Sequence, residues 1–275
     1  TSNNYKNINQ ILKQELNISA RLQQKLIKSH HVYLNSVIVD TRSSVSLNDV
    51  ISVNLNFEEE SKNIIPTSMA LDIIYEDDCF LVLNKPAGIA VHPSILHYTD
   101  SLANGVKHYF DKIGLKRKIR PINRLDLNTS GIIIFAKNEY VQECLIKQMN
   151  SHILKKEYIA IVSGILNDKS GTINLPISRK DGSIIERCVS KDGQTAITDY
   201  SVIKELDNMS VVKCVLQTGR THQIRVHFSA IGHPLIGDFL YGSKSDFINR
   251  QALHSYHISF IHPISNKIIN IYCEL

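Results

Sequence analysis

Short apolar runs alternate with polar turns along this chain, and the most strongly apolar run is IIIF at residues 132–135. Its β-branched and aromatic side chains favour a buried strand. Residues 156–162 alternate instead, so that Tyr158, Ala160 and Val162 would share one face of a second strand. Patterns of these two kinds recur, and they predict many short strands interrupted by a few helices.

Residues 139–149 have the period of a helix with one apolar face. Val141, Leu145 and Met149 recur at helical spacing, and Asn138 is a suitable N-cap. An amide side chain at that position can accept a hydrogen bond from the first free backbone N–H groups. We therefore expect a helix that begins directly after Asn138.

A second helix is predicted over residues 221–231, with Thr221 as its N-cap and Gly232 at its end. Its apolar stripe consists of Ile224, Phe228 and Ile231. Arg225 follows this stripe by one residue, so its side chain should lie at one edge of the buried face. His222 and Thr221 share that edge at three- and four-residue spacing.

The chain should divide near residues 58–68, where EEESKNIIPTS is polar and interrupted by Pro66. Before this segment, residues 20–27 read as a helix, and residues 32–39 and 50–55 alternate like strands. We predict a small N-terminal α/β domain over residues 1–60, a linker over 61–68 and a large domain over 69–275.

Composition limits the class of protein. The chain has 275 residues, of which 43% are hydrophobic, and it contains no run of eighteen apolar residues and no secretory signal. We expect a soluble cytoplasmic protein without a membrane partner. The five cysteines are scattered without paired spacing, so they should be reduced thiols: Cys79, Cys144, Cys188, Cys214 and Cys273.

A basic run leads into one isolated carboxylate, Asp126. Seven lysines and arginines between positions 107 and 124 face a single acid, Asp111, within a chain of net charge +5. Such a run either forms a solvated surface or attracts a phosphate backbone. Asp126 lies in a turn before the 132–135 strand, a common place for catalytic groups. The local pattern also allows Asp126 simply to cap the turn and pair with Arg124.

Five segments in sequence order resemble the RluA-type pseudouridine synthases, enzymes that act on RNA. They are LVLNKPAGIAVHP (81–93), RPINRLDLNTSGIIIFA (120–136), KKEYIAIVSG (155–164), QTGRTHQIRVHFSAIGHPLIGD (217–238) and LHSYHISFIHP (253–263). The resemblance implies an α+β fold: a mixed, mainly antiparallel sheet with flanking helices and a central active-site cleft. Residues 1–60 resemble the RNA-binding domain named after ribosomal protein S-four. Asn123 departs from the family, since many members have His there.

The resemblance also implies roles for seven residues. Asp126 would be the catalytic nucleophile, Arg225 its ion-pair partner, and Tyr158 the group that stacks on the target base and takes a proton from it. Arg124 would fill the gap left by the flipped base. Lys85, Arg220 and His222 match positions near the substrate.

We expect no cofactor, since an isomerisation has no net redox change and no group donor. No metal site is predicted from the twelve histidines, because their spacing lacks convincing carboxylate or cysteine partners. The expected partner is RNA, with ribosomal RNA preferred over transfer RNA, and the expected state is a monomer without an obligate protein partner. A noncatalytic RNA-binding or ribosome-assembly factor and a carboxylate glycosidase or base-excision enzyme remain as alternatives.

Overall fold

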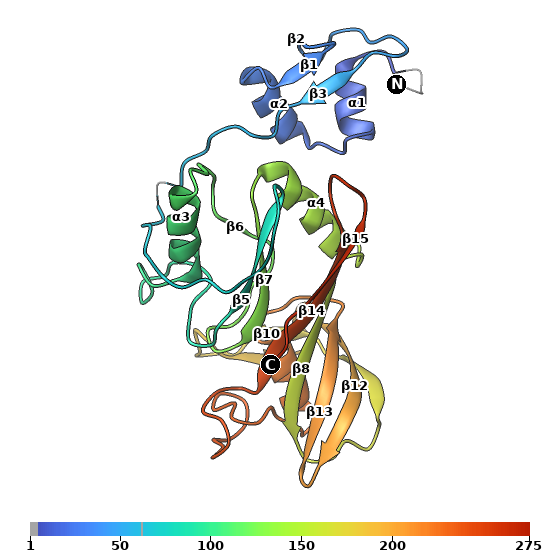
Figure 1. The fold of residues 1–275 in the computed structure, drawn as a ribbon. Helices are drawn as coiled ribbons and strands as arrows, with labels where there is room; N and C mark the ends of the chain where they lie inside the picture. The colour runs from blue at the N-terminus through green and yellow to red at the C-terminus, as the bar shows by residue number, and fades with distance from the viewer. Residues whose placement is uncertain (1–4, 62) are drawn as a thin grey trace.

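The N-terminal part of the chain forms a small unit of its own in this computed structural model, which describes residues 5–61 and 63–275 (Figure 1). Its elements are α1 (Ile8–Gln14), α2 (Ala20–Lys28), β1 (Val32–Leu34), β2 (Val37–Ile38) and β3 (Ile51–Val53). The strands pair antiparallel in the order β2-β1-β3, and the helices bury Leu12, Leu22 and Leu26 against them. The strand expected over 32–39 is a hairpin, because Asn35 and Ser36 adopt positive φ angles of 48° and 69°.

A sheet of ten strands carries the rest of the molecule. Its strands are β4 (Ile73–Glu76), β5 (Phe80–Lys85), β6 (Arg120–Pro121), β7 (Ser130–Ala136), β8 (Lys155–Ser163), β9 (Ser170–Asn174), β12 (Ile197–Leu206), β13 (Met209–Leu216), β14 (Leu253–Ile261) and β15 (Ile268–Tyr272). The main order is β4-β5-β7-β14-β8-β13-β12-β9, with β6 added to β7 and β15 to β14. Among the described residues, β7 and β14 form the one parallel pair. The expected mixed, mainly antiparallel sheet is confirmed.

Helices cover both faces of this sheet. Those of the large domain are α3 (Leu102–Lys112), α4 (Glu139–Asn150) and α5 (Gln223–Ala230). Strand β7 sends Ile133 and Phe135 into the core that contains α3 and α5, and Ile132 and Ile134 into the core that contains α4. Because both faces of β7 are buried, its sequence is an unbroken apolar run rather than an alternation.

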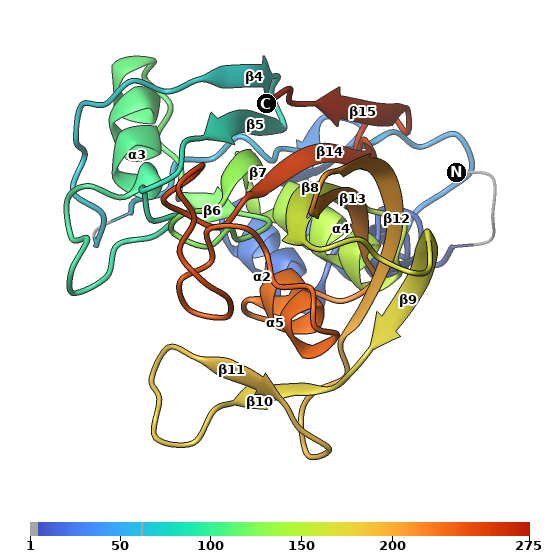
Figure 2. The ribbon, with the colours of Figure 1, turned by 90° about the horizontal axis from the view of Figure 1, so that it is seen from below.

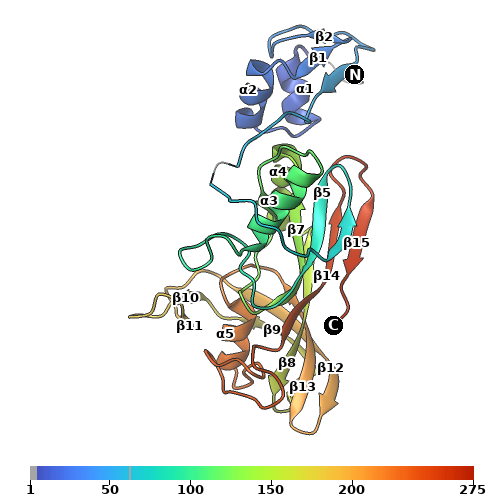
Figure 3. The ribbon, with the colours of Figure 1, turned by 60° about the vertical axis from the view of Figure 1, so that its left-hand side comes forward.

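A separate hairpin of β10 (Ile177–Arg179) and β11 (Arg187–Val189) projects beyond α5, away from the sheet (Figures 2 and 3). All five cysteines lie in the described part of the chain and none is paired. Among residues 5–61 and 63–275, no helix has the length and apolar character needed to cross a membrane.

The backbones of strands β7 and β14 approach each other closely at Gly131. Gly131 has φ of 106°, and a Cβ atom there would lie 2.2 Å from the carbonyl oxygen of Ser255. Beyond a register shift between Ser255 and His257, β14 continues beside β15. The loop between β6 and β7 is therefore held next to β14, a strand that comes much later in the sequence.

The predicted helices are present, with one correction at an end. Helix α4 has the expected N-cap, since the Asn138 side chain accepts from the N–H of Val141 at 2.9 Å. The N-cap of helix α5 is His222 rather than Thr221, and the helix begins at Gln223. The reason is the side chain of Gln223, which accepts from the N–H of Arg220 at 2.9 Å and holds the chain in a turn before the helix.

Candidate active site

A cleft of about 640 Å³ opens where the β6–β7 loop, strand β8, the start of α5 and the end of α4 come together. Six of the seven residues singled out from the sequence line it: Arg124, Asp126, Tyr158, Arg220, His222 and Arg225. These residues come from segments separated by up to about a hundred positions, and the sheet brings them into one space. Lys85 is the exception, because it is fully buried and does not line the cleft.

Asp126 and Arg225 form the centre of the cleft. Nη1 of Arg225 lies 3.2 Å from Oδ2 of Asp126. The same guanidinium donates from Nε and Nη2 to both carboxylate oxygens of Asp238, at 2.7 and 2.8 Å. Asp238 is completely buried, so this fork-shaped pair fixes the plane of the guanidinium and aims its remaining edge at Asp126.

The charge of Arg225 is secured by these carboxylates. Burial alone would lower the pKa of Arg225, but the hydrogen bonds and charge of Asp238, together with Asp126, outweigh burial and raise it. The guanidinium therefore stays positive over any working pH. A permanent cation therefore lies beside the Asp126 carboxylate.

Tyr158 lies on the wall of the cleft formed by β8. Its face of the strand is buried together with Ala160 and Val162, as the alternation predicted, and Tyr158 itself is 5% exposed. Burial raises the pKa of the Tyr158 phenol, and the negative charge of Asp126 adds to the effect. The phenol is consequently protonated at neutral pH.

Lys85 supports the loop that carries Asp126. Its ammonium donates to the carbonyl oxygens of Pro86, Ile89 and Leu127 at 2.8 to 2.9 Å, and Leu127 directly follows Asp126. A buried cation whose three N–H groups are all used in this way orients backbone rather than meeting a substrate. We therefore assign Lys85 to loop positioning.

Further contacts hold the loop from the side of β14. Arg250 donates to the carbonyl of Asn128 at 3.3 Å, and Gln251 donates to the hydroxyl of Thr129 at 3.2 Å. Asn123 binds β7 twice, donating to the carbonyl of Ile132 at 2.9 Å and accepting from the N–H of Ile134 at 3.0 Å. An amide can donate and accept at once, so Asn123 can make both contacts with β7.

Arg124 and Arg220 are the exposed cations of the cleft. Other charges of the basic run are used inside the protein. Arg120 pairs with Glu59 at 2.7 Å with both side chains buried, and Arg117 donates to the carbonyl of Phe57. The run therefore includes structural cations, and counting its charges overestimates what it offers to a phosphate backbone.

Sequence reasoning did not single out Asp238, Arg250 or Tyr241 as functional. Asp238 lies inside a motif used for the resemblance, GHPLIGD, and a lone carboxylate in an apolar segment was the available signal. Tyr241 carries no such signal. Its proximity to the site depends on the fold of the segment after α5.

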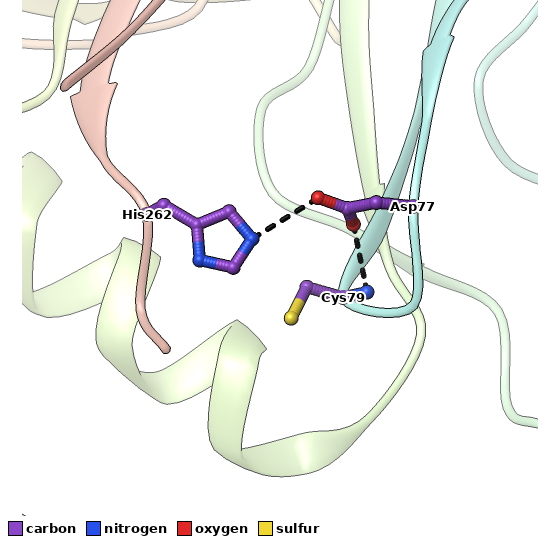
Figure 4. Close-up of side chains that lie close together, drawn as sticks. All are labelled: Asp77, Cys79 and His262. Carbon is purple, nitrogen blue, oxygen red and sulfur yellow. Dashed lines mark hydrogen bonds and ion pairs between the residues drawn. The ribbon is translucent and has the colours of Figure 1, made fainter. Parts of the chain in front are cut away.

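A second polar cluster consists of Asp77, Cys79 and His262, whose potential ligand atoms lie within 4.8 Å of one another (Figure 4). Nδ1 of His262 accepts from the N–H groups of Ile264 and Ser265, so Nε2 carries the hydrogen and donates to Asp77 at 3.0 Å. Burial raises the pKa of the Cys79 thiol to about 11. The hydrogen bonds of Asp77 with His262 and with the N–H of Cys79 thus join two loops.

Comparison with known proteins identifies the class of enzyme. A family model described as RNA pseudouridylate synthase matches residues 79–230. An uncharacterized RNA pseudouridine synthase of Bacillus subtilis (strain 168), YhcT, is 40% identical over 261 residues, covering 94% of this chain and 86% of that protein. The chain belongs to the RNA pseudouridylate synthase family, whose members isomerise uridine to pseudouridine in RNA.

Within that family the similarity includes ribosomal enzymes. The ribosomal large subunit pseudouridine synthase D of Zymomonas mobilis is 35% identical over 255 residues, covering 87% of this chain and 80% of that protein. Among solved structures, human RNA Pseudouridylate Synthase Domain Containing 1 aligns with a TM-score of 0.62 and 26% identity, over 77% of this chain and 86% of that chain. The RluA-type resemblance of the sequence is thereby confirmed.

Proposed function

We propose that this enzyme isomerises specific uridines in structured RNA, with large-subunit ribosomal RNA as its substrate and Asp126 as its single nucleophile. The observation that carries the proposal is the Asp126 carboxylate in the cleft, 3.2 Å from a guanidinium that Asp238 locks in place. The reaction must break the bond from ribose to nitrogen, turn the uracil and join its carbon 5 to the sugar. An ionised carboxylate can begin this either by attacking the anomeric carbon or by assisting removal of a ribose proton.

Tyr158 is assigned the contact with the target base and the removal of the proton from carbon 5. Its raised pKa keeps the phenol protonated in the free enzyme, so Tyr158 can take the carbon 5 proton only after it has given up its own hydroxyl proton. Part of that rise comes from the charge of Asp126, and an Asp126 that has become an ester of the sugar no longer carries this charge. The covalent step would thus lower the pKa of the Tyr158 phenol when its proton transfer is needed.

Arg124 is assigned the opening of the RNA. Its side chain is exposed two residues before Asp126, so it can fill the space of a uridine that has moved into the cleft. Taking a base out of its stack costs a few kcal/mol, and a planar guanidinium replaces part of the lost stacking. Arg220, also exposed, would contact the phosphate backbone.

The ribosomal substrate is supported by the relatives named as large-subunit synthases and by the small N-terminal unit, which has the two helices and short sheet of an S-four-like RNA-binding domain. We assign RNA binding to that unit. Such a substrate would place the enzyme in the cytoplasm. The active unit is proposed to be a monomer.

The test uses ribosomal RNA from cells that lack the protein, incubated with the purified enzyme and mapped for pseudouridine. Asp126→Asn should abolish pseudouridine formation, whereas Asp78→Asn, an exposed carboxylate of the β4–β5 turn, should leave it intact. Formation in transfer RNA alone would refute the ribosomal substrate. Release of free uracil, or full activity of Asp126→Asn, would refute the mechanism.

Arg225→Met provides a second test of the same centre. Removing the guanidinium leaves Asp126 and the buried Asp238 without their cation, so turnover should fall by at least about a hundredfold while RNA binding persists. Gel-shift binding and single-turnover rates separate the two effects. Loss of RNA binding alone would identify Arg225 as a phosphate contact instead.

A further inference from the structure

His222 occupies a strained position at the edge of the cleft. It is the N-cap of α5 with φ of 58°, in the left-handed region that residues other than glycine rarely adopt, and its side chain makes no capping hydrogen bond. Its side chain is only 11% exposed, and Nε2 lies 3.9 Å from Oδ1 of Asp126. Strain of this kind persists where surrounding contacts demand it, and it is concentrated at functional sites.

The contact that holds this side chain is with Tyr241. Nδ1 of His222 lies 2.7 Å from the Tyr241 hydroxyl, and the same hydroxyl accepts from the backbone N–H of Arg187 at 2.8 Å. A backbone N–H can only donate, so the phenolic hydrogen is left free to point at the imidazole. Nδ1 then accepts, and the ring hydrogen belongs on Nε2, facing Asp126.

The surrounding charges agree with a neutral ring. Burial lowers the pKa of His222, and Arg225 of α5 and Arg187 of β11 act in the same direction. Asp126 and Asp238 oppose them without reversing the shift. A neutral imidazole with its hydrogen on Nε2 therefore stands beside the carboxylate oxygen that Arg225 does not bind.

We propose that Tyr241 and His222 are positioning residues of the isomerisation: the Tyr241 hydroxyl fixes the Nε2–H tautomer of His222, and that N–H orients Oδ1 of Asp126 toward the ribose. This inference rests on the proposed role of Asp126 as nucleophile. The separation of 3.9 Å is longer than a hydrogen bond, and contacts of this kind shorten when the substrate is bound. Arg225 would then hold one oxygen of the carboxylate and His222 would guide the other.

Tyr241→Phe tests the first half of the inference, with Tyr109→Phe as the matched control. Tyr109 also loses a hydroxyl hydrogen bond, to Glu76 at 2.6 Å, but on α3 and outside the cleft. Tyr241→Phe should lower kcat about tenfold with little change in KM for RNA, and Tyr109→Phe should change neither. The pKa of His222 should rise in Tyr241→Phe, because the lost hydrogen bond stabilised the neutral ring.

Nitrogen NMR of the imidazole gives a readout independent of activity. The His222 signals, assigned by their disappearance in His222→Asn, should report an Nε2–H tautomer in the unmodified enzyme and a mixture in Tyr241→Phe. An Nδ1–H tautomer in the unmodified enzyme would overturn the proposal. So would a lower rate in Tyr241→Phe with an unchanged tautomer and an unchanged His222 pKa, since that outcome indicates a structural role.

Two substitutions of His222 decide the second half, and they also serve if Tyr241→Phe does not fold. Asparagine tolerates the left-handed backbone but cannot reach the position of Nε2, whereas the glutamine amide can place an N–H there. His222→Gln should retain more activity than His222→Asn, and the reverse order would refute a role for the Nε2–H group. If Asp126→Asn proves active, the assignment of Asp126 as nucleophile fails. The tautomer measurement still tests whether the Tyr241 hydroxyl fixes the tautomer of His222.

Discussion

Lys85 has a charge but no access to solvent. Burial lowers the pKa of Lys85 to about 8, with Arg250 acting in the same direction and Asp126 against it. The ammonium is tolerated because it donates to three backbone carbonyl oxygens, those of Pro86, Ile89 and Leu127. The Lys85 side chain thus connects the turn at Pro86, directly after β5, to the loop that carries Asp126.

The stability of the protein should depend on pH through Lys85. Between pH about 8 and about 10.5 the unfolded chain keeps a proton that the folded chain has lost, so the unfolding free energy rises with pH in this window. The rise should be at most about 1.4 kcal/mol per pH unit. Denaturant unfolding of the unmodified protein and of Lys85→Met would be compared from pH 7 to 10.5, and the difference between them should grow in favour of the unmodified protein. A difference that stays constant would show that Lys85 is not the titrating group.

At this scale the sequence identified the residue types but not their surroundings. The resemblance placed Lys85 near the substrate, and nothing in the pattern around it distinguishes a solvent-facing lysine from one buried against carbonyl groups. Arg117 and Arg120 present the same difficulty, since their acceptors, Phe57 and Glu59, lie about sixty residues away.

The pairing of strands β7 and β14 holds the site in place. Their parallel contact follows the Asp126 loop directly, and Gly131 permits it because a side chain there would collide with the backbone of Ser255. The packing leaves no flexible group that could move aside. The position of Asp126 therefore depends on a residue five places along the chain that takes no part in the chemistry.

Gly131→Ala should destabilise the protein by more than about 3 kcal/mol and remove activity, because the strand pair must separate to admit the methyl group. Gly182→Ala is the matched control, since Gly182 also has a positive φ, of 73°, but has open space around it. That substitution should cost about 1 to 2 kcal/mol from backbone strain alone. Chemical denaturation measures both, and equal losses would show that strain, rather than the collision with Ser255, limits position 131.

Local patterns predicted the elements whose signal is local. Strand β8 and helix α4 followed from alternation, helical spacing and the Asn138 cap. The parallel pairing of β7 with β14 could not be predicted this way, because it depends on the packing of segments more than a hundred residues apart. The start of α5 was misjudged for a related reason: the Gln223 amide binds Ile197 and Thr198 on β12 and so shifts the cap to His222.

On the scale of the whole molecule, the N-terminal unit is joined to the large domain by charged contacts. Lys25 of α2 lies 2.7 Å from Glu59 and 2.9 Å from Glu139 at the start of α4. Glu59 is buried and also binds Arg120. The segment around Glu59, which reads as the beginning of a linker, is therefore part of a packed junction.

Lys25→Ala should loosen this junction while leaving the cleft intact. The substitution removes two ion pairs and leaves the negative charges of Glu59 and Glu139 without the lysine that pairs with both. The N-terminal unit should therefore sample positions away from α4. Small-angle X-ray scattering should then give a larger radius of gyration, with kcat on a short RNA unchanged. Lys28→Ala, at an exposed position of the same helix, should leave the radius as it is. Identical scattering from both variants would contradict a role for Lys25 in docking.

The contact between β7 and β14 also sets when the enzyme can first act during its own synthesis. Ser130 and His254, which are hydrogen-bonded side by side, are 124 residues apart in the chain. The ribosome makes the Asp126 loop long before it makes the strand, Arg250 and Gln251 that hold this loop in place. A chain still being translated should therefore be unable to modify the RNA around it, and activity should begin only after β14 has left the ribosome.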